Sequence, residues 1–119
     1  MSKSDWAENQ TLTTLLGASK YLALSTAATT DAGGITEPSG GAYARILCEW
    51  TITNDTATNT NDEDFPLATA SWGTITHIAV FDAITGGNMI YHGPLDANVI
   101  IDTDDIFRLP AGNLDIVEQ

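Results

Sequence analysis

Basic residues are scarce in this chain: four Lys and Arg stand against sixteen Asp and Glu, and the formal net charge is −12. Such a charge repels a phosphate backbone and an anionic membrane surface. We therefore expect neither nucleic acid nor a membrane as a partner. The charge is typical of a soluble surface that does not adhere to its neighbours.

Cysteine and long apolar runs are also missing. Cys48 is the single cysteine, which excludes an intrachain disulfide, and its apolar neighbours favour a buried, inert thiol over a nucleophile. No apolar run approaches the roughly 20 residues that cross a bilayer. The N-terminus lacks the basic start and apolar block of a signal peptide. We expect a soluble protein made in a reducing cytoplasm.

Patterns that carry catalytic chemistry are few. The Gly-Gly pairs at 33–34 and 40–41 lack the lysine and the strand-to-helix context of a phosphate loop. Ser71 and His77 are available to a triad, but no nucleophile elbow surrounds Ser71, which favours a turn residue. His77 and His92 are too few for a transition-metal site, and ordinary strand histidines are the favoured interpretation.

Acidic and aromatic groups have structural interpretations as well. The clusters 62–64 and 102–105 offer oxygen ligands for Ca²⁺, but neither matches a calcium loop, which favours solvated turns. No pattern indicates the paired carboxylates of a glycoside hydrolase. Trp50, Trp72 and Tyr91 suit a core or an interface better than a sugar-binding face. We expect no catalysis, no cofactor and no metal.

The strongest structural signal is the segment 75–82, whose β-branched and aromatic residues predict a strand. Both alternation phases are apolar from Ile78 to Phe81, so we expect a central strand covered on both faces. Glycines at 86–87 supply the positive φ of a tight turn. Residues 88–92 are predicted to return as a second strand, which Gly93-Pro94 ends. The expected core includes Ile78, Val80, Phe81 and Trp50.

A helix is predicted from Asp5 to Leu16. Ser4 and Asp5 are candidate N-caps, Glu8 lies three residues after Asp5 as in a capping box, and Gly17 is placed to end the helix. The helix has one narrow leucine stripe, which must pack against the sheet or a neighbouring subunit. The stripe consists of Leu12, Leu15 and Leu16.

Other short strands are predicted between turns that contain Gly, Pro or Asp. They are expected at 20–26, 43–53, 69–72, 98–101, 105–109 and 114–117. The segments 26–41 and 54–64 are predicted to be loops, the second of them polar and acidic. This spacing predicts a single all-β domain over residues 1–119, a jelly-roll-like β-sandwich with a helical segment at 1–17.

Alternation predicts which residues of the 43–53 strand share a face. One face should carry Ile46, Cys48, Trp50 and Ile52, and the other Arg45, Leu47, Glu49 and Thr51.

A series of motifs, in order along most of the chain, resembles a known family. The motifs are Trp6–Asn9, Leu15–Gly17, Ser39–Arg45, Phe65-Pro66, Ala70–His77, Val80–Ala83, Thr85–Gly87, Tyr91–Gly93 and Ala111–Leu114. They resemble short virion structural proteins of tailed bacteriophages, often labelled tail fibre proteins. The segment from Thr26 to Glu37 looks shorter than in other members.

The resemblance implies a non-enzymatic, β-rich virion module with no catalytic residues to transfer. Because the chain is short and has no shaft-like repeat or long coiled coil, we expect a capsid decoration or cement protein on the head exterior. Its partner would be the major capsid protein, and a homotrimer is the favoured oligomer. The alternative is a tail fibre or baseplate-associated module that contacts other tail proteins or the host surface. A virion-bound glycan-degrading enzyme has the least support.

The N-terminal segment is the expected docking surface, because it is the least acidic apolar surface of the chain, with Lys3 and Lys20 at its ends. The acidic segment 54–64 should face solvent, away from the shell. An exposed aromatic anchor carries a large share of an interface's energy. The residues expected at the interface are Trp6, Leu12, Leu15, Leu16, Tyr43, Arg45 and Trp72.

Overall fold

The computed structural model describes residues 1, 3–17 and 20–117. Its elements, in chain order, are α1 (Asp5–Leu16), β1 (Lys20–Ser25), β2 (Ile46–Cys48), β3 (Trp50–Thr53), β4 (Thr56–Asn59), β5 (Glu63–Asp64), β6 (Gly73–Phe81), β7 (Met89–Ile101), β8 (Arg108–Leu109) and β9 (Asp115–Val117). All strand pairs are antiparallel among the described residues.

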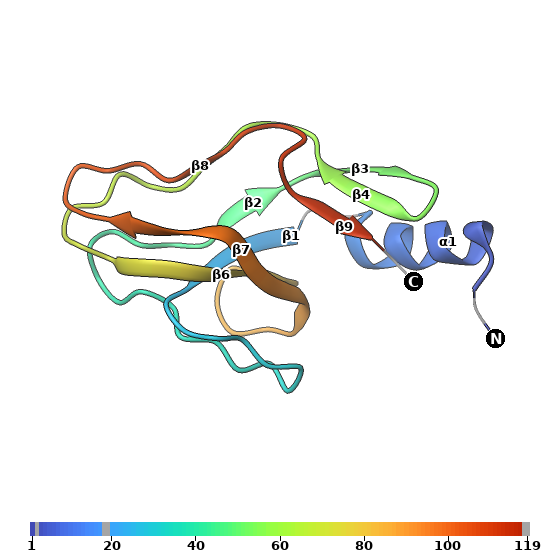
Figure 1. Ribbon diagram of the computed structural model, residues 1–119, viewed down its shortest axis with the longest axis horizontal. Coiled ribbons are helices and arrows are strands. Elements are labelled where there is room, and N and C mark those ends of the chain that lie inside the picture. The colour runs from blue at the N-terminus through green and yellow to red at the C-terminus, as the bar shows by residue number, and fades with distance from the viewer. Residues whose placement is uncertain (2, 18–19, 118–119) are drawn as a thin grey trace.

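The strands form two layers (Figure 1). One layer is a four-stranded sheet in the order β2-β1-β6-β7, and the other holds a three-stranded sheet, β3-β4-β9, and the short pair β5-β8. A core cluster between the layers draws buried side chains from α1 and from all three sheets, including Leu12, Leu22, Ala57, Ile75 and Leu109. The all-β sandwich with one short helix is therefore confirmed.

Strand β6 has the central position that its composition predicts. It lies between β1 and β7, and the four residues from Ile78 to Phe81 are buried. Ile78 and Val80 join the main core, whereas Ala79 and Phe81 belong to a second cluster on the outer face of the sheet. The turn that follows has positive φ at Gly86 and Gly87 (61° and 73°), as predicted.

Strand β7 corrects the prediction that Gly93-Pro94 ends a strand. It continues to Ile101 and takes in the segment predicted as a separate strand at 98–101. Proline is tolerated because β7 is an edge strand, where no second neighbour needs its missing N–H. His77 pairs with Pro94 and Ile75 with Val99, so the residues between Pro94 and Val99 bulge out opposite one residue of β6.

The predicted strand 43–53 is two strands in different sheets, β2 and β3, separated at Glu49. The predicted faces hold for most of it, because Cys48 is buried, Trp50 is partly buried, and Leu47 is exposed. Arg45 departs from the pattern: it lies before the strand and is buried at 8% exposure.

The polar segment 54–64 is not a solvated loop. It forms β4, which pairs with β3 and β9, and β5, which pairs with β8. Asn54, with φ of 55°, makes the tight turn between β3 and β4. Asn59 is 2% exposed and Glu63 is 8% exposed, so the expectation that this segment faces solvent throughout is wrong.

Two smaller predictions also fail. Residues 69–72 form no strand, and the strand predicted at 105–109 is reduced to the two residues of β8. Strands β1 and β9 lie where they were predicted.

The helix α1 has its predicted bounds, and Ser4 caps it by accepting a hydrogen bond from the backbone N–H of Ala7 at 3.2 Å. Gly17 ends it with right-handed φ and its N–H bonded to the Thr13 carbonyl. Among the described residues there is no helix of the length and apolarity that crossing a membrane requires.

Candidate functional site

The residues expected at a docking surface fall into an exposed and a buried group. Trp6 is 73% exposed, but Leu12 and Leu16 are 0% and 2% exposed and belong to the chain's own core. Leu15 is partly buried against the same core. Since α1 packs on β3 and β4, the leucine stripe covers the protein's own sheet rather than a neighbouring subunit. Of this segment, Trp6 remains available to a partner.

The side chain of Arg45 is buried and donates its hydrogen bonds to groups of the same chain. Its Nε and Nη2 donate to the two carboxylate oxygens of Glu37 at 2.9 and 3.0 Å. Its Nη1 donates to the carbonyls of Ala83 and Gly86 at 2.9 and 2.8 Å. The guanidinium thus joins the segment before β2 to the β6–β7 turn. Its donors thus bond within the chain and it is buried, while its expected interface role stays a prediction.

Glu37 and Tyr43 complete this network. Burial raises the pKa of Glu37, but the hydrogen bonds from Arg45 and Tyr43 outweigh it, so the net pKa lies below the ordinary value. The Tyr43 hydroxyl donates to Glu37 at 2.7 Å and accepts from the backbone N–H of Leu24 at 3.0 Å. Burial is the main cause of a raised pKa for Tyr43. These contacts hold the segment between β1 and β2 on the sheet.

Trp72 is likewise buried, at 4% exposure. Its indole N–H donates to the carbonyl of Gly41 at 2.8 Å, and its ring meets Tyr43 edge-on at 5.3 Å between centroids. Gly41 has φ of 59°, and a Cβ there would lie 2.9 Å from the indole nitrogen. Trp72 is therefore a core residue and Tyr43 packs partly buried against the core, while their expected place at an interface stays a prediction.

His92 carries a contact that sequence reasoning missed. Its Nε2 lies 2.7 Å from the Asp31 carboxylate, and its Nδ1 lies 2.7 Å from the Thr29 hydroxyl. A triad orients its base with a buried carboxylate, whereas the Asp31 side chain is fully exposed. The arrangement fits a tether between the 26–36 segment and β7. No local pattern could reveal it, because the partners lie far apart in the sequence.

The other candidate catalytic groups are engaged in local structure. Ser71 donates to the Ile101 carbonyl and accepts from the N–H of Gly73, as a turn residue does. His77 bonds the hydroxyl of Thr76. Burial, with Glu63 and Glu49 nearby, raises the pKa of the Cys48 thiol to about 12. The buried thiol that the sequence predicts is confirmed, and its lack of reactivity stays a prediction.

The acidic clusters bond within the chain. Asp64 accepts two hydrogen bonds from Arg108, and Asp62 accepts one from the N–H of Ala111 at 2.8 Å. The N–H of Asp102 donates to Asp105. In the described part of the chain, no three His, Cys, Asp or Glu side chains gather as metal ligands would.

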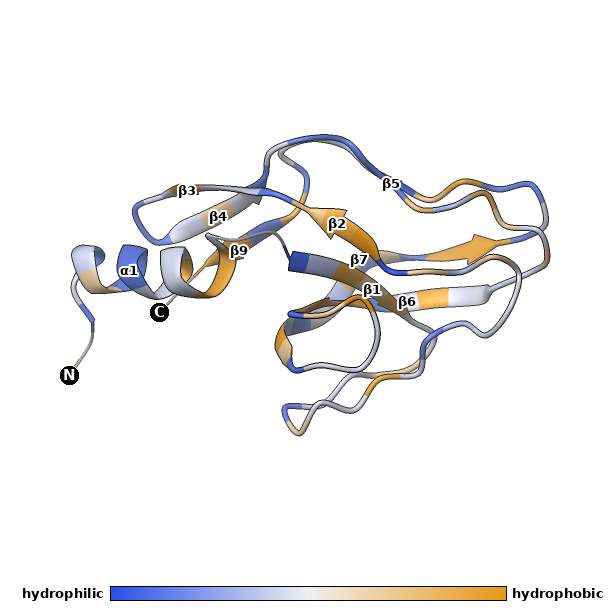
Figure 2. Cartoon of the chain, turned by 180° about the vertical axis from the view of Figure 1, so that it is seen from behind, coloured by the Kyte–Doolittle hydropathy of each residue, from blue (hydrophilic) through white to orange (hydrophobic). Residues whose placement is uncertain are grey.

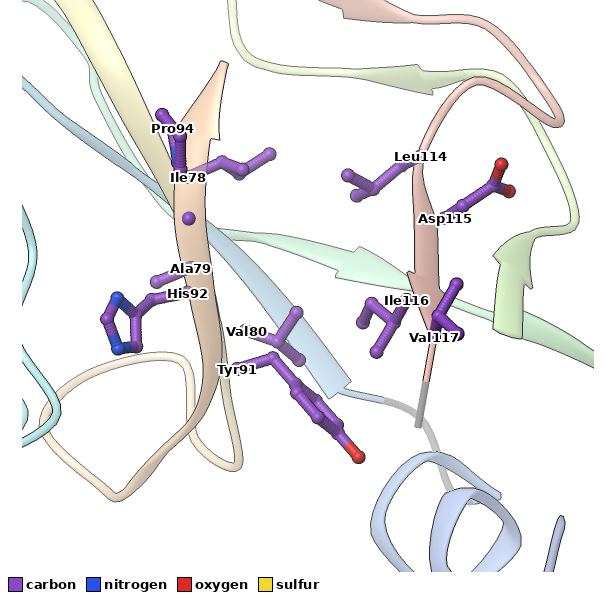
Figure 3. A pocket seen from close by; sticks show the side chains of 11 residues that line it. Ile78, Ala79, Val80, Tyr91, His92, Pro94, Leu114, Asp115, Ile116 and Val117 are labelled. Carbon is purple, nitrogen blue, oxygen red and sulfur yellow. The ribbon is translucent and has the colours of Figure 1, made fainter. Parts of the chain in front are cut away.

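One concave feature lies between the edge strands β7 and β9 (Figure 3). A hollow of about 300 Å³ is lined by Ile78, Ala79, Val80, residues 91–94 and residues 114–117. Ile78, Val80 and Tyr91 project from one side toward Leu114 and Ile116 on the other, whereas His92 and Asp115 point away from it. The side chains that project into it are mainly apolar, with the phenol ring of Tyr91 among them.

Comparison with known proteins gives one family. A family model with the description "Podophage GP4 fiber I protein gp80" matches residues 2–117, nearly the whole chain. A search of curated proteins finds no match. The match confirms the resemblance to virion structural proteins of tailed phages that the sequence motifs carry.

Proposed function

We propose, from the premise that this chain belongs to the family of podophage GP4 fiber I protein gp80 and is a phage virion structural protein, that it serves in the tail as a fibre module. The family match over residues 2–117 is the observation that carries this proposal. It favours the tail over the head exterior that the chain's short length suggests. The module would contact other tail proteins or the host surface.

The shape and surface of the chain support an attachment role. The molecule measures 46 × 28 × 25 Å, and α1 lies at one end of its long axis (Figure 1). Trp6, on that helix, is exposed. Aromatic side chains are enriched among the residues that dominate interface energies. We propose that Trp6 anchors this end to a neighbouring virion protein, in place of the wider leucine surface.

Further parts of the proposal concern oligomers and catalysis. We propose a homotrimer with no enzymatic activity and no cofactor. The absence of enzymatic activity is supported by the contacts of the candidate catalytic groups. Ser71, His77 and His92 all bond to nearby groups, and the Cys48 thiol is buried. A net charge of −12 per copy supports a protein partner over nucleic acid or a membrane.

Copy number and position in the particle test the main proposal. Densitometry of purified virions should give a handful of copies, and gold-labelled antibody should mark the tail. Hundreds of copies, with label spread over the head, would overturn the tail assignment and return the decoration role. Light scattering of the purified chain should give the mass of three copies, and a monomer would contradict the trimer.

A further inference from the structure

The groove between β7 and β9 is an opening in the sandwich. β7 is the edge of the four-stranded sheet and has β6 as its partner, while β9 is the edge of the three-stranded sheet and has β4. A second hollow of about 430 Å³ continues it past Leu95, Val99, Phe107 and Leu109. The two hollows share Ile78, Pro94, Leu114 and Asp115, so they form one groove. Along it, core side chains are left partly uncovered.

The walls of the groove combine apolar side chains with strand edges. Tyr91, Leu114 and Ile116 are only partly buried, although they pack against the core. An edge strand presents a row of backbone N–H and C=O groups that has no neighbour. An extended peptide can pair with such an edge while its alternate side chains enter pockets. The groove therefore suits a strand better than a helix or a small polar ligand.

Gly93 provides the space for such side chains. It pairs with Ile78, so a side chain at position 93 would share the groove face. A Cβ at Gly93 would meet nothing within 4 Å, and its φ is not in the left-handed region. The backbone thus needs no glycine here, and the missing side chain leaves the groove open at its middle.

The charge of the groove rim favours a different protein over a second copy of this chain as the occupant of the groove. The groove rim carries the exposed carboxylate of Asp96, whereas the carboxylate of Asp115 is turned away and accepts a hydrogen bond from the Thr58 hydroxyl at 2.7 Å. The nearby cation, Arg108, is neutralised by Asp64. Another copy that docked edge to edge here would place its own acidic rim beside this one, which a trimer contact elsewhere on the chain would avoid. Like charges across an interface oppose association, and complementary charges favour it.

We propose that this groove binds an extended segment of a different virion protein, with apolar residues at alternate positions and Lys or Arg at its ends. The segment adds a strand at the β7 or β9 edge and covers Ile78, Tyr91 and Ile116. The identity of the partner as a particle component rests on the proposed function. The groove chemistry does not, and it is tested separately.

Peptide binding to the full chain tests the inference. The probe is a synthetic peptide in which Val and Ile alternate with Thr and Lys stands at both ends. One control peptide has Glu ends, and another has its apolar residues in one block. Amide chemical shifts should change at 91–93 and 115–117, and the Glu-ended peptide should bind about tenfold more weakly. Equal binding of all three peptides, or shifts elsewhere, would overturn the proposal.

Gly93→Val is the decisive variant. It fills the groove, and it should keep or raise the melting temperature because valine suits a strand better than glycine does. Binding of the Lys-ended peptide should be lost. Thr74→Val, at an exposed position of β6, is the matched control and should bind normally. Asp96→Lys, at an exposed rim position, should weaken binding of the Lys-ended peptide without unfolding the chain.

Two results separate the possibilities further. Unchanged binding by Gly93→Val would overturn the groove as the site. Concentration-dependent shifts of the same amides without peptide would overturn the choice of a different partner and favour a second copy. A head location with peptide binding intact would contradict the proposed tail function alone. A tail location without peptide binding would contradict the groove alone.

Discussion

The guanidinium of Arg45 lies 3.8 Å from the centre of the Phe81 ring while it binds Glu37 through two nitrogens. This stack covers the outer face of the central strand β6, which would otherwise expose an aromatic ring. The second face of the sheet is thus closed by a buried ion pair and a loop rather than by another sheet. Figure 2 shows the long connections that cover this side.

Replacing Arg45 with alanine should strongly destabilise the fold. The change leaves Glu37 and two carbonyls without their donor in a partly buried site, and we expect a loss of roughly 3 kcal/mol in the free energy of unfolding. Urea denaturation followed by tryptophan fluorescence measures it. Arg108→Ala removes the exposed pair with Asp64 and should change stability far less. Similar losses for both variants would contradict the structural role of Arg45.

Phe81→Ala should cost about 3–5 kcal/mol, because the ring is 4% exposed and truncation leaves a cavity beneath Arg45. Thermal unfolding followed by circular dichroism checks this. Ile84→Ala, at a residue 53% exposed in the following turn, is the control and should have little effect. An unchanged melting temperature for Phe81→Ala would show that β6 is not central.

Replacing each of two glutamates with glutamine should change the melting temperature at pH 7 in opposite directions. Burial raises the pKa of Glu63 above its ordinary 4.5, with Glu49 and Asp64 adding to the effect. Ionised Glu63 therefore lowers stability at pH 7, so Glu63→Gln should raise the melting temperature there. The gain should shrink as the pH falls through the raised pKa and vanish below 4.5.

Glu37→Gln should behave in the opposite way. Although burial opposes ionisation, Arg45 and Tyr43 hold the pKa of Glu37 below 4.5. Ionised Glu37 stabilises the fold above 4.5, and this contribution is lost as the pH falls through the lowered pKa. The variant should melt below the wild type at pH 7 and approach it in acid. Parallel pH profiles for the two variants would contradict these assignments.

Alanine variants of Trp6 and Leu12 distinguish a role in attachment to the virion from a role in the stability of the fold. Leu12 is fully buried, so Leu12→Ala should cost about 2–5 kcal/mol. Trp6→Ala should leave the melting temperature nearly unchanged, because its side chain is exposed, but should reduce incorporation into particles. Quantitative mass spectrometry of virions grown with each variant measures incorporation. Normal incorporation of Trp6→Ala would exclude Trp6 as the anchor.

The burial of Leu12 and Leu16 also changes the result expected when residues 1–17 are deleted. If residues 1–17 were only a docking arm, their removal would leave the β-domain folded. Because Leu12 and Leu16 complete the core, deletion should destabilise the domain itself.

Local patterns predict those elements whose apolar residues follow the period of a strand or of a helix. β6 was recognisable because both of its phases are apolar, and α1 because its leucines follow helical spacing. The sequence does not predict β4, because its threonine and asparagine are typical of loops. In the structure Asn59 is buried and bonds Pro110, Asn61 and Leu114. The Asn54-Asp55 turn between two alternating segments was the available signal.

The candidate sites were less predictable than the strands. Arg45 and Glu37 resemble ordinary surface charges in sequence, and their burial depends on a loop crossing the sheet. The tether of His92 to Asp31 and the groove at Gly93 depend on pairings between distant segments. Such contacts follow from register and topology, which a one-residue shift would change.

The strand order has a consequence for synthesis on the ribosome. β1 lies between β2 and β6, and Tyr21 pairs with Phe81, more than half the chain later. When β1 leaves the exit tunnel, its principal partner has not yet been translated, and α1 likewise awaits β3 and β4. Topologies dominated by such distant pairings fold slowly. The nascent β1 can therefore pair with β2 first, but it completes its place in the sheet only when β6 emerges.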